Sequence, residues 1–254
     1  MTLSRTAPTR GRIEQVCLLV GAVLIVSGLV HLVVFAVDGG PWYGPVSWRK
    51  PVTFGLSFGL TLITVTWVAA RLPLGERTRA LVLGVFAADC VVEVGGITVQ
   101  AWRGVPSHIN RETPFDSAVS MVLAAGGGVL IATLTVLAVA AFRPNPHVAA
   151  SMRLALRAGF GTLMLGLATG AAMIARGVME VNAGRQQEAY GVTGFLKPVH
   201  GVSLHGVLVL PALAALLSLT SWDERRRTRV VAIAAAAYGA AILAALVYSL
   251  LPSP

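Results

Sequence analysis

Long apolar stretches alternate with short polar segments along the whole chain. A helix that crosses the hydrocarbon core of a bilayer needs about 20 consecutive, mostly apolar residues. The stretches of that length are residues 15–37, 52–70, 80–101, 117–142, 154–178, 199–221 and 230–251. The pattern predicts an all-α polytopic membrane bundle of seven transmembrane helices, formed as a single domain over residues 15–251. Residues 1–14 and 252–254 are predicted to be short tails.

The composition supports this class of protein. Hydrophobic residues make up 56% of the chain and charged residues 12%, against about a quarter charged residues in a soluble domain. The sequence pI is near 10.7, but the basic residues separate the apolar stretches instead of clustering on one surface. That distribution is typical of membrane topology and not of nucleic-acid binding. We therefore expect the lipid bilayer to be the main partner, with no nucleic acid.

The basic residues also predict the orientation of the chain. Seven spans place the two termini on opposite sides of the membrane, and cytoplasmic connections are enriched in Lys and Arg. The richer side carries Arg5, Arg10, Arg12, Arg71, Arg77, Arg79, Arg143, Arg153, Arg157, Arg225, Arg226, Arg227 and Arg229. We predict a cytoplasmic N-terminus and an external C-terminus. The Arg-, Ala- and Gly-rich composition is typical of a GC-rich bacterial genome, which suggests the bacterial inner membrane.

Two carboxylates lie inside the third predicted span. Ionisable side chains within a membrane are costly and are a default sign of function. Asp89 and Glu93 are four residues apart, and Gln100 is seven residues beyond Glu93. At about 100° per residue, the three side chains form one polar stripe on a helix. We expect this stripe to face the bundle interior and one of the two carboxyl groups to carry a proton.

Three possible metal or haem ligands are predicted at a similar depth. His31 and His205 lie about 8–9 Å below the outer boundary of their helices, and Glu93 lies about 12 Å below it. His108, in a polar outer connection, could act as a fourth ligand from a lid. Two imidazoles suit a haem b iron, and imidazole with carboxylate suits a non-haem transition metal. The competing interpretation is that the histidines only form interhelical hydrogen bonds that fix packing.

The outer rim carries further polar side chains. His200 is five residues before His205, about 140° away on a helix, so we place His200 at the rim and His205 in the interior. Cations at the rim are either interfacial anchors or contacts for an anion or a lipid headgroup. The rim group is Arg49, Lys50, Arg103, Arg176, Lys197 and His200. Asp116, three residues after Thr113, is predicted to take part in a helix N-cap.

The chain resembles a known family through several motifs taken in order. These are WRKPVTFGLSFG (48–59), the carboxylate at position 93 followed by QAWRGVPSHIN (100–110), TPFD (113–116) and LKPVHGVSLHG (196–206). They resemble a widespread family of uncharacterised bacterial multi-pass membrane proteins, over nearly the whole chain. The resemblance singles out Lys50, Glu93, Gln100, Arg103, His108, Asn110, Asp116, His200 and His205. Ile109 departs from the aromatic residue expected there. The resemblance implies a site and no particular reaction.

A second resemblance concerns one segment only. HGVSLHG (200–206), together with a carboxylate on the third of seven spans, is similar to the accessory third subunit of haem-copper oxidases. The histidine spacing differs and the other motifs of that subunit are missing. This likeness keeps an accessory role in view.

Three functions follow from these features, and no hydrolase, phosphate-binding or dinucleotide-binding motif favours a particular enzyme. The first is a metal- or haem-binding, redox-active membrane protein built on His31, Glu93, His108 and His205. The second is a proton-coupled carrier of a small solute that uses Asp89 and Glu93. The third is an accessory or structural subunit, or a homo-oligomer, in which the polar groups tie helices together.

Overall fold

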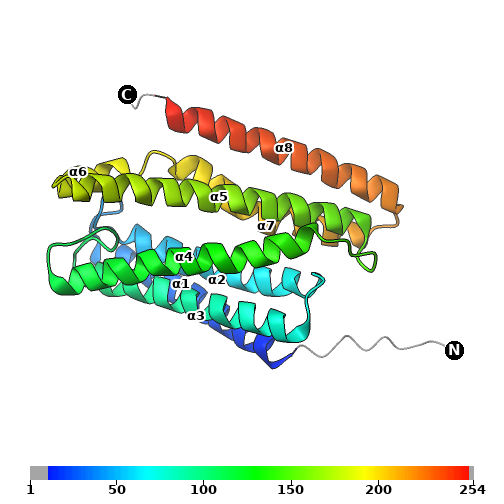
Figure 1. The fold of residues 1–254 in the computed structure, drawn as a ribbon, viewed down its shortest axis with the longest axis horizontal. Coiled ribbons are helices and arrows are strands. Elements are labelled where there is room, and N and C mark those ends of the chain that lie inside the picture. The colour runs from blue at the N-terminus through cyan, green and yellow to red at the C-terminus, as the bar shows by residue number, and fades with distance from the viewer. Residues whose placement is uncertain (1–10, 252–254) are drawn as a thin grey trace.

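The computed structural model describes residues 11–251, in which all regular secondary structure is helical (Figure 1). Its helices are α1 (Arg12–Asp38), α2 (Arg49–Ala69), α3 (Glu76–Trp102), α4 (Pro114–Phe142), α5 (Ala150–Asn182), α6 (Gln186–Val192), α7 (Lys197–Ser218) and α8 (Glu224–Leu250). All except α6 are long and apolar enough to cross a membrane. The predicted bundle of seven spans is therefore confirmed. Of the predicted tails, residues 12–14 belong instead to α1, and residues 1–10 and 252–254 lie outside the described part of the chain.

The helices differ from the predicted spans mainly at their ends. The apolar stretch of the fifth span ends near residue 178, but α5 continues to Asn182. The connection after it, predicted as a loop, contains the seven-residue helix α6. Both differences arise because a helix can continue in polar sequence beyond the lipid, where hydropathy no longer marks its end.

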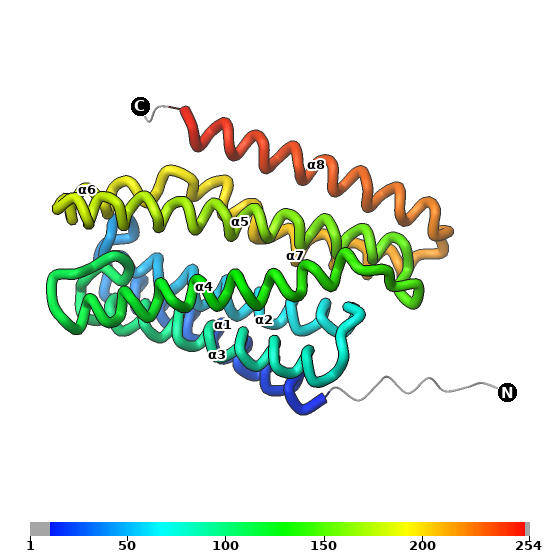
Figure 2. Tube along the Cα trace, viewed as in Figure 1, coloured from blue at the N-terminus to red at the C-terminus, as the bar shows by residue number. Residues whose placement is uncertain are grey.

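The helices run roughly parallel to one long axis and form two groups (Figures 1 and 2). In the first group, α1 packs against α2 and α3, and α3 packs against α4. In the second group, α7 packs against α5 and α8. The two groups meet where α4 contacts α5 and where α2 contacts α7. We call the end with α6 and the 39–48 and 103–113 connections the outer end, following the predicted orientation.

Glycines allow the helices within each group to approach closely. A Cβ atom added at Gly55 of α2 would lie 2.7 Å from the backbone nitrogen of Gly28 in α1. A Cβ atom at Gly159 of α5 would lie 2.9 Å from the Cα of Val207 in α7. Small residues at such contacts are typical of helix packing in lipid, where no hydrophobic driving force acts between helices.

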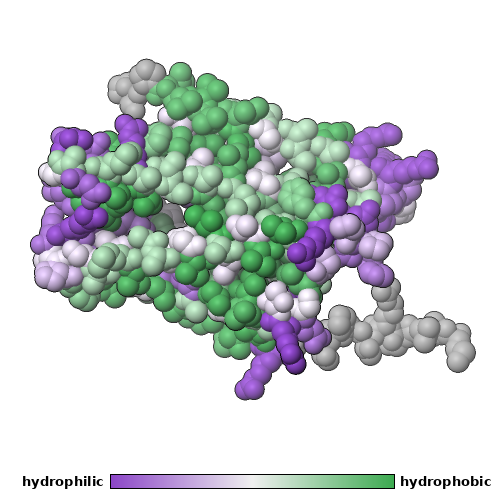
Figure 3. Space-filling view, in the orientation of Figure 1, coloured by the Kyte–Doolittle hydropathy of each residue, from purple (hydrophilic) through white to green (hydrophobic). Residues whose placement is uncertain are grey.

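The surface has the distribution expected of a protein in a bilayer. Apolar side chains cover the middle of the molecule, and polar side chains gather at its two ends (Figure 3). Large apolar side chains are well exposed around the bundle, among them Leu19, Val33, Leu216 and Ile233. In this view the surface is also hollowed between α4 and α5 toward the outer end (Figure 3). A surface of this kind needs lipid to cover it, and the molecule is a multi-pass helical membrane protein.

Candidate functional site

The most unusual polar group is a pair of carboxylates at the middle of α3. Asp89 is 7% exposed and Glu93 is 4% exposed, and both side chains approach Gly126 of α4. A Cβ atom added at Gly126 would lie 2.6 Å from Glu93 Oε1 and 2.9 Å from Asp89 Oδ1. The two carboxyl groups therefore converge on one point of α4 where the chain has no side chain. The predicted inward-facing stripe is present, because Gln100 is fully buried as well.

These two carboxyl groups have no partner within the described part of the chain. Neither forms a side-chain hydrogen bond or an ion pair there, and Asp89 Oδ2 is fully buried without any hydrogen-bond partner. A buried polar group normally has such a partner, since leaving it unsatisfied costs about 1–3 kcal/mol or more. The pair is therefore maintained at a cost to stability, which favours a functional role.

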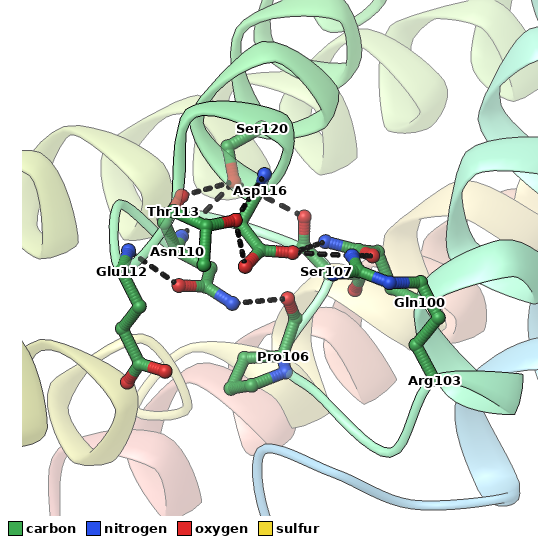
Figure 4. Close-up of polar contacts among 9 residues, drawn as sticks. All are labelled: Gln100, Arg103, Pro106, Ser107, Asn110, Glu112, Thr113, Asp116 and Ser120. Atoms are coloured by element: carbon green, nitrogen blue, oxygen red, sulfur yellow. Dashed lines mark hydrogen bonds and ion pairs between the residues drawn. The ribbon is translucent and has the colours of Figure 1, made fainter.

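A second polar group closes the outer end of α3 onto α4 (Figure 4). Asp116 accepts hydrogen bonds from Gln100 Nε2 at 2.8 Å and from Thr113 Oγ1 at 2.6 Å. It also forms an ion pair with Arg103 at 2.5 Å. The backbone N–H of Asp116 donates in turn to Thr113 Oγ1 at 3.1 Å, so the predicted N-cap is confirmed. Every member of this group is paired, which is typical of a structural network.

The same network fixes the 103–113 connection. Asn110 donates from its backbone to Ser120 Oγ at 3.0 Å and from its side chain to the carbonyl of Pro106 at 3.3 Å. The preceding residue, Ile109, has a φ of 54°, which is uncommon for a β-branched side chain. Asn110 is fully buried, and its bonds hold the connection in this strained conformation. Asn110 therefore has a positioning role.

His108 lies at the inner face of this connection. Its Nδ1 lies 3.0 Å from Ser107 Oγ, and its ring centroid lies 6.0 Å from that of Phe54 in α2. Burial and the positive charge of Lys50 lower the pKa of His108 from 6.5 to about 4. The imidazole is therefore neutral at physiological pH and packs between the connection and the first turns of α2.

His31 is fully used by its neighbours. Its Nδ1 donates to the carbonyl of Ser27 at 2.7 Å, and its Nε2 accepts from the indole N–H of Trp102 at 3.1 Å. Its ring also lies 6.1 Å from that of Trp48, centroid to centroid. Because both ring nitrogens are occupied, the contacts favour the packing interpretation, in which His31 joins α1 to α3.

The predicted placement of the two histidines of α7 is reversed. His200 is half-buried, and its Nδ1 donates to the carbonyl of Gly166 in α5 at 2.7 Å. His205 is exposed, and its Nδ1 donates to the carbonyl of Gly201 within the same helix. The inner face of α7 contains Ser203, and a residue two positions later points about 200° away from it. The prediction that His205 faces the interior is wrong.

The predicted metal or haem ligands do not form one site. α1 carries His31 and packs against α2 and α3, whereas α7 carries His205 on a face away from the bundle. No group of three His, Cys, Asp or Glu side chains over residues 11–251 is placed to hold a metal ion. His31, Glu93, His108 and His205 therefore do not fit a shared metal or haem, and we derive no chemistry through such a group.

The rim cations have separate environments. Arg103 is paired with Asp116, as described above, and Arg176 stacks over the ring of Phe195 at 4.7 Å. Arg49 lies over the ring of Tyr43 at 5.4 Å. Lys50 Nζ donates to the carbonyl of Pro45 at 2.8 Å. Arg103 is thus part of the structural network, while the cations at the starts of α2 and α7 have no acidic partner in the described residues.

Some relevant features had little or no signal in the sequence. Gly126 belongs to a run of three glycines, and only the contact with α3 distinguishes it from Gly127 and Gly128. Trp102 directly follows the predicted span 80–101, where an aromatic residue is ordinary, so its bond to His31 could not be foreseen. The hydroxyl groups of Ser47 and Ser203 are buried without a partner, which no local pattern indicates.

Comparisons with family models, curated proteins and solved structures found no match to this chain. The fold and the surface define it as a multi-pass α-helical membrane protein. Any statement about its activity rests on the geometry described above.

Proposed function

We propose that this protein is a proton-coupled carrier of a small solute in the bacterial inner membrane, with Asp89 and Glu93 binding and releasing the coupling proton. The observation that supports this proposal is the unpaired, buried pair of carboxyl groups at Gly126. Asn and Gln would fill the same space at lower cost in lipid. Asp89 and Glu93 differ from those amides in one property, which is that a carboxyl group can bind and release a proton.

The position of the pair suits alternating access. Asp89 is the midpoint of α3, thirteen residues and therefore about 20 Å from either end of the helix. Two carboxyl groups so close together in a low dielectric do not both ionise readily, so the pair retains a proton until water reaches it. The two helix groups meet along α4–α5 and α2–α7, and a small rotation between them would change which end admits water.

The two other functions have weaker support. A metal or haem protein needs converging ligands, and the candidate donors lie on separate faces of the bundle. An accessory subunit would use its polar groups to tie helices together. His31 and Asp116 fit that role, but Asp89 and Glu93 do not because they have no partner. Membership of the family that the motifs resemble is part of the proposal and adds no activity to it.

Transport in proteoliposomes tests the proposal. Purified protein is reconstituted with a pH-sensitive dye inside, and a panel of small carboxylates, amines, amino acids and inorganic ions is added outside. We expect at least one solute to acidify the interior with wild-type protein. Glu93→Gln and Asp89→Asn should reduce this signal at least tenfold, because neither amide can carry the proton.

The matched control is Glu188→Gln, which removes an exposed outer carboxylate. It should leave the signal unchanged. An unchanged proton signal in both acid variants would contradict the proposal, and so would a panel in which no solute moves protons.

A further inference from the structure

Four basic side chains gather at the outer end between the two helix groups. We call Arg49, Lys50, His108 and Lys197 the outer cationic cluster. Arg49 and Lys50 begin α2, Lys197 begins α7, and His108 belongs to the 103–113 connection. The cluster therefore draws on three elements that are far apart in the sequence, and two of these elements, α2 and α7, contact each other.

Arg49, Lys50 and Lys197 are close enough for their positive charges to repel one another, whereas His108 is the neutral member of the cluster. Lys50 experiences the charges of Lys197 and Arg49, and Lys197 experiences the charge of Arg49. His108 experiences the charge of Lys50 and packs near Phe54, one turn along α2. Lys50 is only half-exposed, so water screens this repulsion incompletely.

No carboxylate in the described residues balances these charges. Two other outer cations do have carboxylate partners: Arg103 pairs with Asp116, and Arg185 pairs with Glu180 and Glu188. None of the ion pairs within residues 11–251 includes Arg49, Lys50 or Lys197. The cluster therefore brings together three outer cations that have no carboxylate partner in this part of the chain.

The helix ends add to the positive potential. The N-terminus of a helix carries a partial positive charge, so cations there are unfavourable and anions are favourable. α2 and α7 both begin in the cluster, neither has an acidic residue in its first turn, and neither start is capped by a side-chain hydrogen bond. Two uncapped helix starts beside the side chains of Arg49, Lys50 and Lys197 make a favourable environment for an oxyanion.

An independent observation comes from Ser47, just before α2. Its side chain is 4% exposed, and its Oγ is buried without a hydrogen-bond partner. The segment that leads into α2 thus contains a buried hydroxyl donor that no group in the described residues uses.

We propose that the outer cationic cluster binds an oxyanion, a carboxylate or phosphate group, and that in the carrier proposed above this group belongs to the transported solute. The second part rests on the proposed function. It also fits the acidic pair, since a singly charged anion that moves together with one proton carries no net charge through the bundle. The cost of moving a charge through lipid is then avoided.

Equilibrium binding tests the site without any need for transport. The full chain is placed in nanodiscs of phosphatidylcholine, and binding of inorganic phosphate and of acetate is measured by titration calorimetry at constant ionic strength. We expect saturable binding of at least one of them. Lys197→Gln should weaken it at least tenfold, and its exposed side chain can be replaced without disturbing the core. Lys50→Gln provides a second variant.

Arg111→Gln is the matched control, because it removes an exposed outer cation that is bonded to Asn182 and lies outside the cluster. It should leave the affinity unchanged. Equal weakening by Arg111→Gln and Lys197→Gln, or no saturable binding of either anion in any disc, would overturn the site.

A second set of nanodiscs that contain phosphatidylglycerol distinguishes the source of the oxyanion. If the free anions bind equally well in both lipids, the site takes a solute. If phosphatidylglycerol abolishes their binding in wild-type protein but Lys197→Gln removes the lipid effect, the site takes a headgroup, and the substrate role is overturned. Binding should survive Glu93→Gln, so failure of proton coupling and failure of the anion site are distinguishable.

Discussion

At the scale of single residues, the acidic pair depends on the absence of a side chain at Gly126 of α4. Gly126 leaves space for both carboxyl groups, whereas a Cβ added at Gly127 or Gly128 would meet no atom within 4 Å. Of three consecutive glycines with the same local sequence signal, only Gly126 therefore faces the acidic pair. The space at Gly126 lets two carboxyl groups share one position in the bundle.

We predict that Gly126→Ala displaces the carboxyl groups. Overpacking lowers the free energy of unfolding by about 1–3 kcal/mol, and replacing a helical glycine by alanine raises it by up to about 1 kcal/mol. We therefore expect the free energy of unfolding to fall by about 1 kcal/mol. Proton-coupled uptake should fall several-fold. Unfolding in detergent and the dye assay measure the two effects. Gly127→Ala and Gly128→Ala are the controls, and equal losses in all three variants would contradict the prediction.

His108 gives a prediction about pH. The unfolded chain binds a proton near pH 6.5, but folded His108 binds one only near pH 4. As the pH falls between these values the unfolded state takes up a proton first, so the folded state loses stability, by at most about 3 kcal/mol. Unfolding measured from pH 7.5 to 4 should show this loss. His108→Gln should reduce it, whereas His147→Gln, in the exposed α4–α5 connection, should not.

The histidines also show where sequence reasoning stops at this scale. The depth of His31 and His205 follows from their distance to the ends of the apolar stretches, because each residue adds about 1.5 Å. The rotation of each helix about its axis does not follow, since α7 is apolar nearly all round and its polar residues lie on more than one face. Thus the sequence predicts how deep each histidine lies in its helix, but the predicted side of α7 for His205 was wrong.

At the scale of the elements, the seven spans could be predicted because the bilayer sets one length for all of them. The helix α6 could not, because its seven residues are too short and too polar to leave a hydropathy signal. The glycine contacts between helices could be predicted only in part. Gly55 and Gly59 form a recognisable small-residue pair, but only the structure identifies α1, with Gly21 and Gly28, as the partner.

The α1–α2 contact yields a prediction of its own. A side chain at Gly55 would meet backbone atoms of α1, which cannot rotate away as a side chain can. Gly55→Ala should therefore push the helices apart and lower the free energy of unfolding by about 1–3 kcal/mol. Gly95→Ala in α3 is the control, because a Cβ there meets open space. Thermal unfolding in detergent should separate the two, and a neutral Gly55→Ala would contradict the close contact.

At the scale of the whole molecule, hydropathy indicates how many times the chain crosses but not which helices are neighbours. Asp89 and Glu93 were predicted as one stripe because they share a helix. The convergence of His31 with His205 required α1 to lie beside the inner face of α7, and the bundle places α1 against α2 and α3 instead. The candidate site could therefore be predicted within one helix and not between helices.

The orientation of the molecule is testable by labelling in intact cells. We predict that Arg111→Cys, in the outer connection, reacts with a membrane-impermeant maleimide from outside. Arg77→Cys, at the inner start of α3, should react only after the cells are permeabilised. Both native cysteines are buried, which keeps the background low. The reverse pattern would show that the charge rule assigns the wrong side.

The aromatic contact around His31 has a practical consequence for all of these experiments. Trp48 and Trp102 pack edge to face at 5.2 Å between ring centroids, beside the first turn of α2. Trp42 also lies at this end and packs on Phe35, whereas two indoles at the opposite end stack on arginines, Trp67 on Arg71 and Trp222 on Arg226. Intrinsic fluorescence thus contains an optical reporter at each end of the bundle. Replacing the tryptophans of one end by Phe would restrict the fluorescence to the other end. The fluorescence of such variants, with no added label, would then show which end responds when an anion is added.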